Sequence, residues 1–378
     1  MRVIVAPDSF KGSLSAPQVA RAIAEGVRKA CPACLVDEIP IADGGEGTLD
    51  ALVHARQGEY RTYSVQGPLG HPVAARLGLL DGGRIGVIEM AQASGLLLIP
   101  PQQRNPLLTS TFGTGELVRA ALDLGVSELI ITIGGSATVD GGLGLLAALG
   151  AKFYDENHRE LQPLGGSLPH LARVDLAGLD KRLPGCRITI ASDVTNPLCG
   201  PLGAAPVFGP QKGATPEMVE LLAQGLNKFA AVTAAATGVA VQDLPGAGGA
   251  GGLGAALIAY AGGIMHSGID VVLDTIDIDS RLAGASLVFT GEGRLDGQTV
   301  QGKAPVGLAR RARACGCPVI ALVGGLGANY EAVYEQGIAG VFPVESGPME
   351  LSYAMQHAAE LIAAAAYRVM HFWVEFSS

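Results

Sequence analysis

Strand and helix patterns alternate along the first sixty residues of this 378-residue chain, and this alternation restricts the folds that it can adopt. A short apolar run at 3–6 is followed by helical periodicity at 16–31, a second apolar run at 36–41 and another helical pattern from about residue 46. This order is typical of a parallel sheet with helices on its faces. We therefore predict an α/β fold that begins with a Rossmann-like parallel sheet.

The same pattern returns in the last hundred residues, after a middle region rich in Gly, Pro and short alternating runs. The late apolar runs, each followed by a glycine-bearing loop, lie at 287–290, 319–323 and 339–342. Because a chain of this length exceeds the usual size of one hydrophobic core, two domains are expected. We predict a Rossmann-like domain from 1–66 and 283–378, a second α/β domain inserted as 67–282, and an active site in the cleft between the domains.

The composition of the chain argues against some classes of binding partner. The formal net charge is −9, without a basic cluster, which disfavours nucleic acid and membrane surfaces because clustered Lys and Arg bind their phosphates. Six cysteines in a chain without a signal-peptide pattern favour a reduced cytoplasm. We expect a structural or incidental role for Cys31 and Cys34. The oligomeric state stays open between monomer and homodimer.

Acid, hydroxyl and lysine side chains follow the first predicted strand, in the loop that contains Asp8, Ser9 and Lys11. In doubly wound sheets, ligands bind beyond the carboxyl ends of the strands, and anions bind where backbone N–H groups meet a helix N-terminus. Lys11 is therefore a candidate phosphate ligand, and Asp8 and Ser9 are candidate contacts of substrate or nucleotide. A solvated loop lysine is the alternative.

The next loop presents Asp43 and Glu46 among glycines. Mg²⁺ is commonly held by one or two carboxylates together with substrate phosphates, so this pair is a candidate metal site. A helix cap at Asp43, with Glu46 in the first helical turn, would explain the same residues.

Glycines and hydroxyl residues cluster at 134–142, directly after the apolar run 129–133. Glycine lets the backbone approach phosphate oxygens and turn its N–H groups inward, so Gly134, Gly135 and Ser136 are candidates for binding nucleotide phosphate. Close packing of a tight strand-to-helix connection is the alternative.

Two further glycine patterns match nucleotide motifs less well. Residues 245–254 contain G-x-G-x-x-G, but the preceding segment 239–241 is a short strand at best, which disfavours dinucleotide binding. Residues 297–303 fit G-x-x-x-x-G-K, but Ala304 replaces the hydroxyl residue that would hold Mg²⁺ in a P-loop. We therefore do not expect a Walker A site.

Acids and a lysine nevertheless follow the buried run that ends at Thr290. This arrangement places charged groups at the carboxyl edge of the sheet again. Glu292 and Asp296 are candidate magnesium ligands, Lys303 is a candidate phosphate ligand, and Thr290 and Gly291 are candidate contacts of substrate or nucleotide.

One more carboxylate stands at the end of a predicted strand, 188–192. Asp193 could accept a proton from a substrate hydroxyl, while Asn196, three residues later, orients metal or substrate. The alternative is that Asp193 caps a turn with its side chain.

Six segments keep one order over nearly the whole chain. They are APDSFKGSLSA at 6–16, IADGGEGT at 41–48, IGGSATVDGG at 133–142, DVTNPL at 193–198, FGPQKGA at 208–214 and GEGRLDGQT at 291–299. Together they resemble the bacterial type I glycerate kinase family. The tail 370–378 is more aromatic than this resemblance leads us to expect, which leaves the end of the last helix open.

The resemblance implies a kinase that uses ATP and Mg²⁺ to convert D-glycerate to 2-phosphoglycerate, with an alcohol group as phosphate acceptor. On this hypothesis Asp193 is the base at the glycerate hydroxyl, and Lys11 and Lys303 contact phosphate. Ser94 and Arg104 are candidates for the glycerate carboxylate. The magnesium ligands come from a pool of Asp43, Glu46, Glu292 and Asp296.

Other functions stay open beside this one. A kinase that forms 3-phosphoglycerate would use the same kind of site. A nicotinamide-dependent oxidoreductase of hydroxy acids would depend on the glycine tract 246–254. A non-catalytic metabolite sensor is disfavoured by the acidic balance of the chain.

Overall fold

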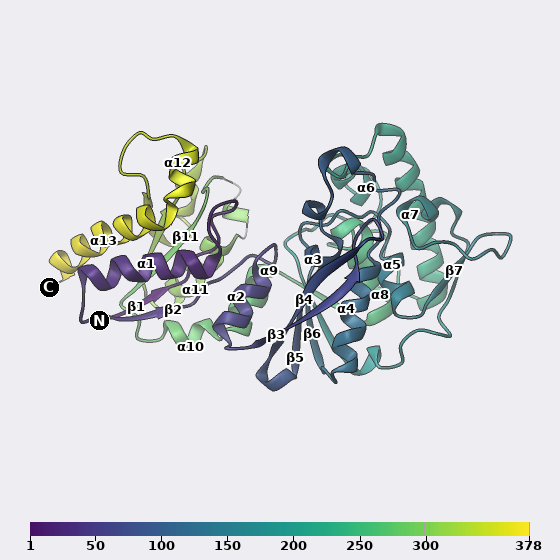
Figure 1. Ribbon diagram of the computed structural model, residues 1–378, viewed down its shortest axis with the longest axis horizontal. Helices are drawn as coiled ribbons and strands as arrows, with labels where there is room; N and C mark the ends of the chain where they lie inside the picture. The colour runs from purple at the N-terminus through teal and green to yellow at the C-terminus, as the bar shows by residue number, and fades with distance from the viewer. Residues whose placement is uncertain (298, 302, 378) are drawn as a thin grey trace. The chain divides into compact units, whose positions relative to one another are not determined.

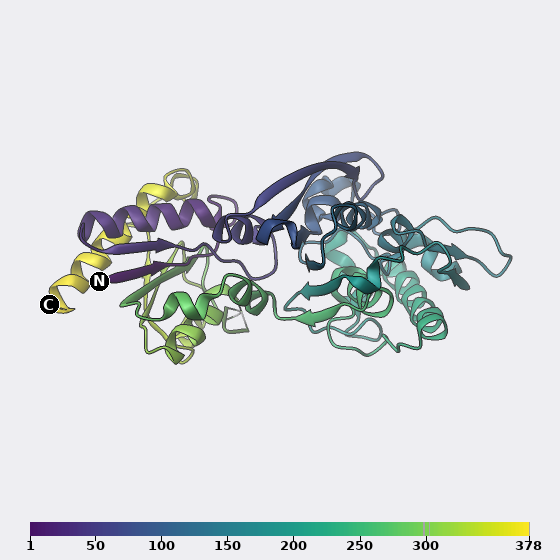
Figure 2. The same cartoon turned by 90° about the horizontal axis from the view of Figure 1, so that it is seen from below.

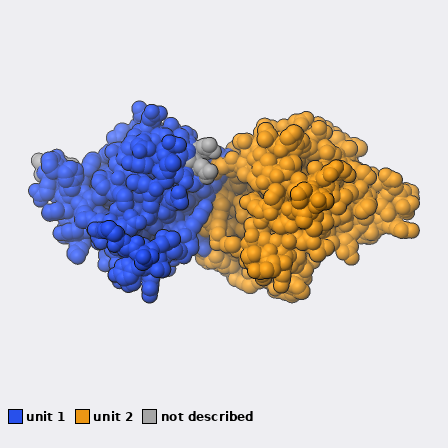
Figure 3. Space-filling view, turned by 90° about the horizontal axis from the view of Figure 1, so that it is seen from above, with its two compact units in different colours: residues 1–43, 50–57, 267–378 blue, residues 44–49, 58–266 orange. Residues whose placement is uncertain are grey.

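The computed structural model describes residues 1–297, 299–301 and 303–377. It divides into two compact units, coloured separately in Figure 3. Unit 1 comprises residues 1–43, 50–57 and 267–378, and unit 2 comprises residues 44–49 and 58–266. Parallel sheets with helices occur in both units, so the predicted α/β fold class is confirmed.

Unit 1 is built on a five-stranded parallel sheet in the order β13-β12-β11-β1-β2. Its strands are β1 (Arg2–Val5), β2 (Leu35–Glu38), β11 (Leu287–Glu292), β12 (Val319–Val323) and β13 (Ile338–Pro343). Numbered within the sheet, this is the doubly wound order 2-1-3-4-5, which reverses direction between β1 and β11. Val3 pairs with Leu287 there, so the first strand of the chain pairs with a strand of the last hundred residues inside one sheet.

Helices cover both faces of this sheet, which explains why its strands β11 and β12 are buried throughout. The helices of unit 1 are α1 (Ala16–Ala30), α2 (Thr48–Ala55), α9 (Gly268–Thr275), α10 (Ile278–Leu282), α11 (Ala304–Ala314), α12 (Leu351–Gln356) and α13 (Ala358–Ser377). Helices α1 and α13 lie side by side on one face (Figures 1 and 2). A Cβ at Gly26 of α1 would lie 2.2 Å from the Ala363 carbonyl oxygen of α13, so glycine is what permits this close approach.

Unit 2 is built on a six-stranded sheet in the order β10-β9-β6-β5-β4-β3. Its strands are β3 (Glu59–Gln66), β4 (Pro72–Leu80), β5 (Ile85–Glu89), β6 (Glu128–Thr132), β9 (Arg187–Ala191) and β10 (Ile264–His266), and a separate pair is formed by β7 (Lys152–Tyr154) and β8 (Arg173–Asp175). Strands β3, β4 and β5 pair antiparallel, and the other pairs of the six-stranded sheet are parallel.

The helices of unit 2 pack with this sheet around a second hydrophobic core. They are α3 (Ala91–Ser94), α4 (Phe112–Asp123), α5 (Leu143–Ala148), α6 (Ala204–Phe208), α7 (Pro216–Thr237) and α8 (Leu253–Ala261). Phe229 of α7 and Leu145 of α5 are fully buried in that core. Unit 2 therefore has its own apolar interior, as expected of a folding unit.

The limits of the two units differ from the predicted domain boundaries. Strand β3 pairs along its whole length with β4, so residues 58–66 belong to unit 2 rather than to the first domain. Residues 267–282 belong to unit 1, because Arg311 of α11 donates hydrogen bonds to Asp274 and Asp279 beside it. Both segments, 58–66 and 267–282, are hydrogen-bonded to the unit to which they belong, and no change in composition marks these limits.

Cys31 and Cys34 form a disulfide with a Cα–Cα distance of 5.5 Å, directly after α1 and before β2. This position fits the structural role that we expected. The bonded pair differs from the reduced thiols that a cytoplasmic location favours. Among the described residues the free cysteines are Cys186, Cys199, Cys315 and Cys317.

In the part of the chain that the structure describes, no helix has the length and apolar character that crossing a bilayer requires.

Candidate active site

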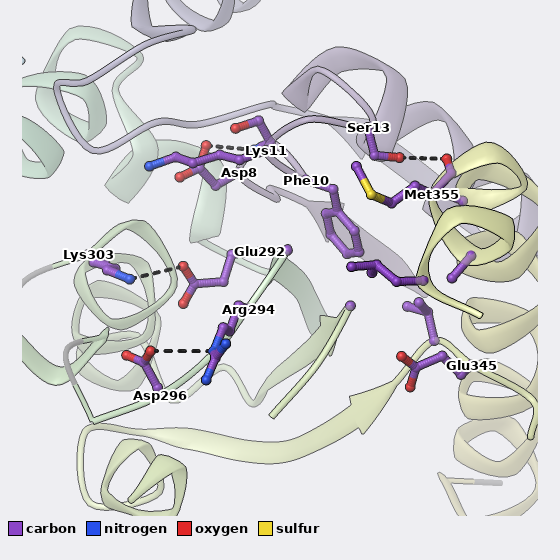
Figure 4. A pocket seen from close by; sticks show the side chains of 17 residues that line it. Asp8, Phe10, Lys11, Ser13, Glu292, Arg294, Asp296, Lys303, Glu345 and Met355 are labelled. Atoms are coloured by element: carbon purple, nitrogen blue, oxygen red, sulfur yellow. Dashed lines mark hydrogen bonds and ion pairs between the residues drawn. The ribbon is translucent and has the colours of Figure 1, made fainter. Parts of the chain in front are cut away.

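A cavity of about 350 Å³ lies in unit 1 beyond the carboxyl ends of β1 and β11 (Figure 4). These are the strands between which the sheet order reverses, and ligands of doubly wound sheets bind at that point. The cavity brings together six residues predicted from separate loops: Asp8, Ser9, Lys11, Glu292, Asp296 and Lys303. The motif partners Gln298 and Gly302 lie outside the described residues.

Asp8 is the most enclosed carboxylate of this cavity, with 5% of its surface exposed. The backbone N–H of Ser9 donates a hydrogen bond to Asp8 Oδ1 at 2.6 Å. Burial, followed by the negative charge of Asp43, raises the pKa of Asp8 to about 7. The positive charge of Lys11 lowers the pKa of Asp8 and so offsets part of this rise. Asp8 is thus a buried acid in a charged pocket, and its protonation changes near neutral pH.

Glu292, the last residue of β11, is held from two sides. Thr299 Oγ1 donates to Glu292 Oε1 at 2.7 Å, and Lys303 Nζ lies 3.7 Å from Glu292 Oε2. Burial raises the pKa of Glu292, and the Thr299 hydrogen bond and the Lys303 charge oppose that rise. Lys303 is therefore paired with an acid, but its side chain keeps 33% of its surface exposed and can reach a ligand.

Thr290 and Gly291 are engaged within the sheet. Thr290 Oγ1 donates to the Ala6 carbonyl oxygen at 2.9 Å, and a Cβ at Gly291 would lie 2.1 Å from the carbonyl oxygen of Leu322. The Gly291 carbonyl oxygen accepts from the Asp8 N–H at 2.9 Å. Both residues support the site by fixing the loop of Asp8, and their predicted contact with a ligand stays a prediction.

Replacing Asp8 with asparagine is expected to flatten the pH dependence of stability in magnesium-free buffer. A carboxyl group whose folded pKa is raised contributes stability that is present at low pH and lost as the pH rises through that pKa. From about pH 4 to pH 7, the wild-type free energy of unfolding should lose about 2–4 kcal/mol through this group. Urea denaturation at pH 5 and pH 8 measures the change, and equal losses in wild type and Asp8→Asn would contradict it.

The predicted metal ligands are divided between the two units. Asp43 is half-buried in unit 1 and acts electrostatically on Asp8 and Glu292, whereas Glu46 is exposed in the loop 44–49 of unit 2. Among the described residues, no group of three or more His, Cys, Asp or Glu side chains is arranged to hold a metal ion. One or two carboxylates with substrate phosphates need no such group, so the oxygen donors present fit Mg²⁺.

The start of α2 is occupied by a buried carboxylate that the sequence analysis missed. Glu89, at the end of β5, accepts from the backbone N–H groups of Gly47 and Leu49 at 3.1 and 3.2 Å. It has 4% of its surface exposed. These two N–H groups serve Glu89, so the loop 44–49 does not offer them to a phosphate.

The glycine cluster 134–142 is a rigid loop of unit 2. Lys212 Nζ donates to Ser136 Oγ and to the Thr138 carbonyl oxygen, both at 2.7 Å. Asp140 accepts from Thr111 N and Oγ1 at 2.7 and 2.8 Å, and also from the N–H groups of residues 142 and 144. Several polar groups that could cradle a phosphate are thus already bonded within the protein.

Lys212 and Asp140 carry opposite charges in the interior, where both are nearly inaccessible to solvent. Burial lowers the pKa of Lys212 to about 7, and the charge of Asp140 opposes that shift. Burial also raises the pKa of Asp140, against the hydrogen bonds that it accepts. Lys212 stands in one of the motifs quoted above, but its burial has no signal in the sequence because lysines are mostly exposed.

A backbone hydrogen bond connects Ser94 to the glycine cluster 134–142. The Ala137 N–H donates to the Ser94 carbonyl oxygen at 2.9 Å, and Ser94 Oγ is hydrogen-bonded to Thr114 Oγ1 at 2.7 Å. Arg104 lies against the turn after Lys212, since a Cβ at Gly213 would be 2.3 Å from the Arg104 carbonyl oxygen. Arg104 Nε is buried without a hydrogen-bond partner. Ser94, Arg104 and Gly134 to Ser136 are thus linked through packed segments of unit 2.

Asp193 and Asn196 follow β9, as predicted, also in unit 2. Asp193 is exposed. Asn196 Nδ2 donates to the Leu202 carbonyl oxygen at 2.9 Å, so the amide stabilises its own loop. Their catalytic roles stay predictions.

The glycine tract 246–254 does not have the context of a dinucleotide-binding loop. Residues 239–241 form no strand, and the tract enters α8 through turns. A Cβ at Gly248 would lie 2.2 Å from the Pro197 carbonyl oxygen, and one at Gly251 would lie 2.1 Å from the Thr138 carbonyl oxygen. These glycines allow close packing against neighbouring loops, which removes the main support for an oxidoreductase.

Part of the lining of the unit 1 cavity was not predicted from the sequence. Residues from the C-terminal segment line it, among them Val344, Glu345, Leu351 and Met355. No motif marks them, and more than three hundred residues separate them from the loop of Lys11. Only the return of the chain to the first sheet brings them to the site.

Comparison with known proteins identifies the family. Residues 3–374 match the glycerate kinase family. The chain is 49% identical over 360 residues to a glycerate kinase of Bacillus subtilis (strain 168), covering 95% of this chain and 94% of that protein. It is 46% identical over 369 residues to the glycerate 2-kinase of Escherichia coli (strain K12), covering 98% and 97%.

A solved structure agrees with the sequence relatives. A crystal structure of a Salmonella typhimurium LT2 protein, provisionally named glycerate kinase 2, superposes with a TM-score of 0.91 at 47% identity, covering 100% of this chain and 99% of that one. The resemblance drawn from the six sequence segments is thereby confirmed. The chain belongs to the glycerate kinase family.

Proposed function

We propose that this kinase transfers the γ-phosphoryl group of ATP to the 2-hydroxyl of D-glycerate and releases 2-phosphoglycerate. The observation that carries the proposal is the cavity at the switch point of the unit 1 sheet, where Lys11 and Lys303 stand beside Asp8 and Glu292. Phosphoryl transfer needs positioned charge more than covalent chemistry, and this set of groups supplies it. The name of the Escherichia coli relative, glycerate 2-kinase, supports the 2-hydroxyl.

In the proposed mechanism, Lys11 and Lys303 bind phosphate oxygens and balance their negative charge. Carboxylates from Asp43, Glu46, Glu292 and Asp296 form the pool that would hold Mg²⁺, which would supply positive charge to the phosphate oxygens. Burial and the charges of Asp43 and Glu292 raise the pKa of Asp8 to about 7. Ser9 keeps the Asp8 carboxylate oriented through its N–H.

The acceptor side of the proposal uses residues of unit 2. Asp193 takes the proton of the glycerate hydroxyl as the oxygen attacks phosphorus, and Asn196 helps to orient the substrate. Ser94 and Arg104 are proposed contacts of the glycerate carboxylate, supported by the buried and unpaired Arg104 Nε. Gly134, Gly135 and Ser136 remain proposed phosphate contacts with the groups that Lys212 and Asp140 leave available.

Glycerate-dependent release of ADP in the presence of Mg²⁺ tests the activity. Phosphorus NMR of the product then separates 2-phosphoglycerate from 3-phosphoglycerate. We expect ADP release only with glycerate present, and the 2-phosphate as product. Release of ADP at the same rate without glycerate would contradict the function, and a 3-phosphate product would contradict only the position of transfer. The proposal includes a cytoplasmic enzyme that acts as a monomer or homodimer on small molecules, without a nucleic-acid partner.

A further inference from the structure

The cavity of unit 1 has two chemically different halves. In Figure 4, Asp8, Lys11 and Glu292 gather on one side, and Phe10 and Met355 lie on the other. The apolar half is formed by Phe10, Val344, Leu351, Ala354, Met355 and Ala358. The charged half suits the phosphates of the proposed nucleotide. Phosphates alone would leave the apolar half without a ligand group to contact.

Helix α12 contributes Leu351, Ala354 and Met355, half of the residues of this apolar half, although no residue of the helix is buried. Leu351 has 74% of its surface exposed and Met355 has 38%, and both line the cavity. Apolar side chains that stay exposed around a concave site indicate a surface that a ligand covers. A ligand that fills this cavity should therefore have an apolar face.

Helix α12 is tied to the loop that carries Lys11. Ser13 Oγ donates a hydrogen bond to the Met355 carbonyl oxygen at 2.8 Å. Gly12 has a φ of +79°, and a Cβ there would lie 3.2 Å from Met355 Cε. These contacts fix the apolar wall at a set position beside the lysine, so one ligand can touch both.

The size and chemistry of the cavity exclude glycerate as its full occupant. A volume of about 350 Å³ is in the range of pockets that enclose whole cofactors or drug-sized ligands. A three-carbon acid with two hydroxyls has no flat apolar surface for Phe10, Leu351 and Met355 to contact. A purine has two such faces, and in ATP it is joined through ribose to the phosphates.

We propose that the apolar half of this cavity binds the adenine base of the nucleotide, with the phosphates directed to Lys11 and Lys303. Glu345, exposed at the edge of the cavity, accepts a hydrogen bond from the ribose hydroxyls or the adenine amino group. The inference rests on the proposed function for the choice of ATP as the nucleotide. It adds a base-binding wall built from residues 344–358.

Calorimetric titration with Mg²⁺-ADP and with Mg²⁺-tripolyphosphate tests this proposal, because tripolyphosphate lacks the base. The double variant Leu351→Ala/Met355→Ala should weaken ADP binding by about tenfold, because it removes apolar surface that the base would cover. Its affinity for tripolyphosphate should stay at the wild-type value. Tyr353→Ala is the matched control, because Tyr353 lies on the same helix, is 51% exposed, stacks on His357 and does not line the cavity.

Each outcome decides between base binding and its alternatives. Selective loss of ADP affinity in the double variant, with Tyr353→Ala unchanged, supports the proposal. Unchanged ADP affinity in the double variant, or an equal loss for ADP and tripolyphosphate, overturns it, as does a changed KM for glycerate with unchanged ADP binding. The titrations need no turnover, so a protein that binds ADP in this way but does not phosphorylate glycerate would refute the proposed function alone.

Discussion

Replacing Lys212 with methionine is expected to lower the free energy of unfolding by about 3–5 kcal/mol at pH 6. At that pH the side chain is charged, because its pKa is about 7. Methionine keeps most of the volume but leaves Ser136 Oγ and the Thr138 carbonyl oxygen without their donor. It also leaves the buried charge of Asp140 uncompensated.

Urea denaturation followed by circular dichroism measures this loss. Lys228→Met is the matched control, since Lys228 stands on α7 in the same unit with 48% of its side-chain surface exposed. Its distant ion pair with Glu156 is worth about 0–1 kcal/mol at most. Similar unfolding energies for the two variants would show that the buried lysine is not a main support of the loop 134–142.

The second large effect is expected from Asp193→Asn. If Asp193 accepts the hydroxyl proton, the amide should lower kcat by about 10²–10⁴-fold, because asparagine cannot take up that proton. Binding of Mg²⁺-ADP should stay near the wild-type affinity, since the amide has almost the same size and Asp193 has no proposed contact with the nucleotide.

Steady-state kinetics with saturating glycerate and calorimetry with Mg²⁺-ADP separate these two effects. Asp243→Asn serves as the control, as Asp243 is another exposed carboxylate of unit 2 outside the proposed site. A kcat for Asp193→Asn equal to that of this control would refute the role of Asp193 as base. If Asp193→Asn lowers the affinity for ADP and leaves kcat unchanged, Asp193 has a role in nucleotide binding and not in proton transfer.

The elements with strong local patterns were predictable from the sequence. Helix α1 has Val19, Ile23 and Val27 at helical spacing, and all three are fully buried. Strand β12 and the first three residues of β11 are apolar, as expected when helices cover both faces of a sheet. In these segments local propensity and tertiary burial require the same residues.

Strand β3 could not be recognised in this way. Its residues are mostly exposed, and it lies outermost in its sheet. Its pairing with β4 depends on a partner strand rather than on an apolar pattern of its own. This is the physical reason why the predicted boundary after residue 66 differs from the limit of unit 2.

The candidate site was predictable only in part. Charged residues at strand ends indicated Asp8, Lys11, Glu292 and Lys303, because the carboxyl ends of parallel strands meet at one edge. The apolar wall of α12 carries no such signal, since exposed leucine and methionine residues occur on most protein surfaces. Its part in a cavity follows from the tertiary fold alone.

The central pairing of the unit 1 sheet has a consequence for synthesis of the protein. Val3 of β1 pairs with Leu287 of β11, and all of unit 2 lies between β2 and β11 in the chain. Because chains emerge from the ribosome N-terminus first, the apolar faces of β1 and α1 stay exposed until the last hundred residues have been synthesised. We expect nascent chains truncated before residue 287 to bind holdase chaperones through this N-terminal segment, while unit 2 already resists proteolysis.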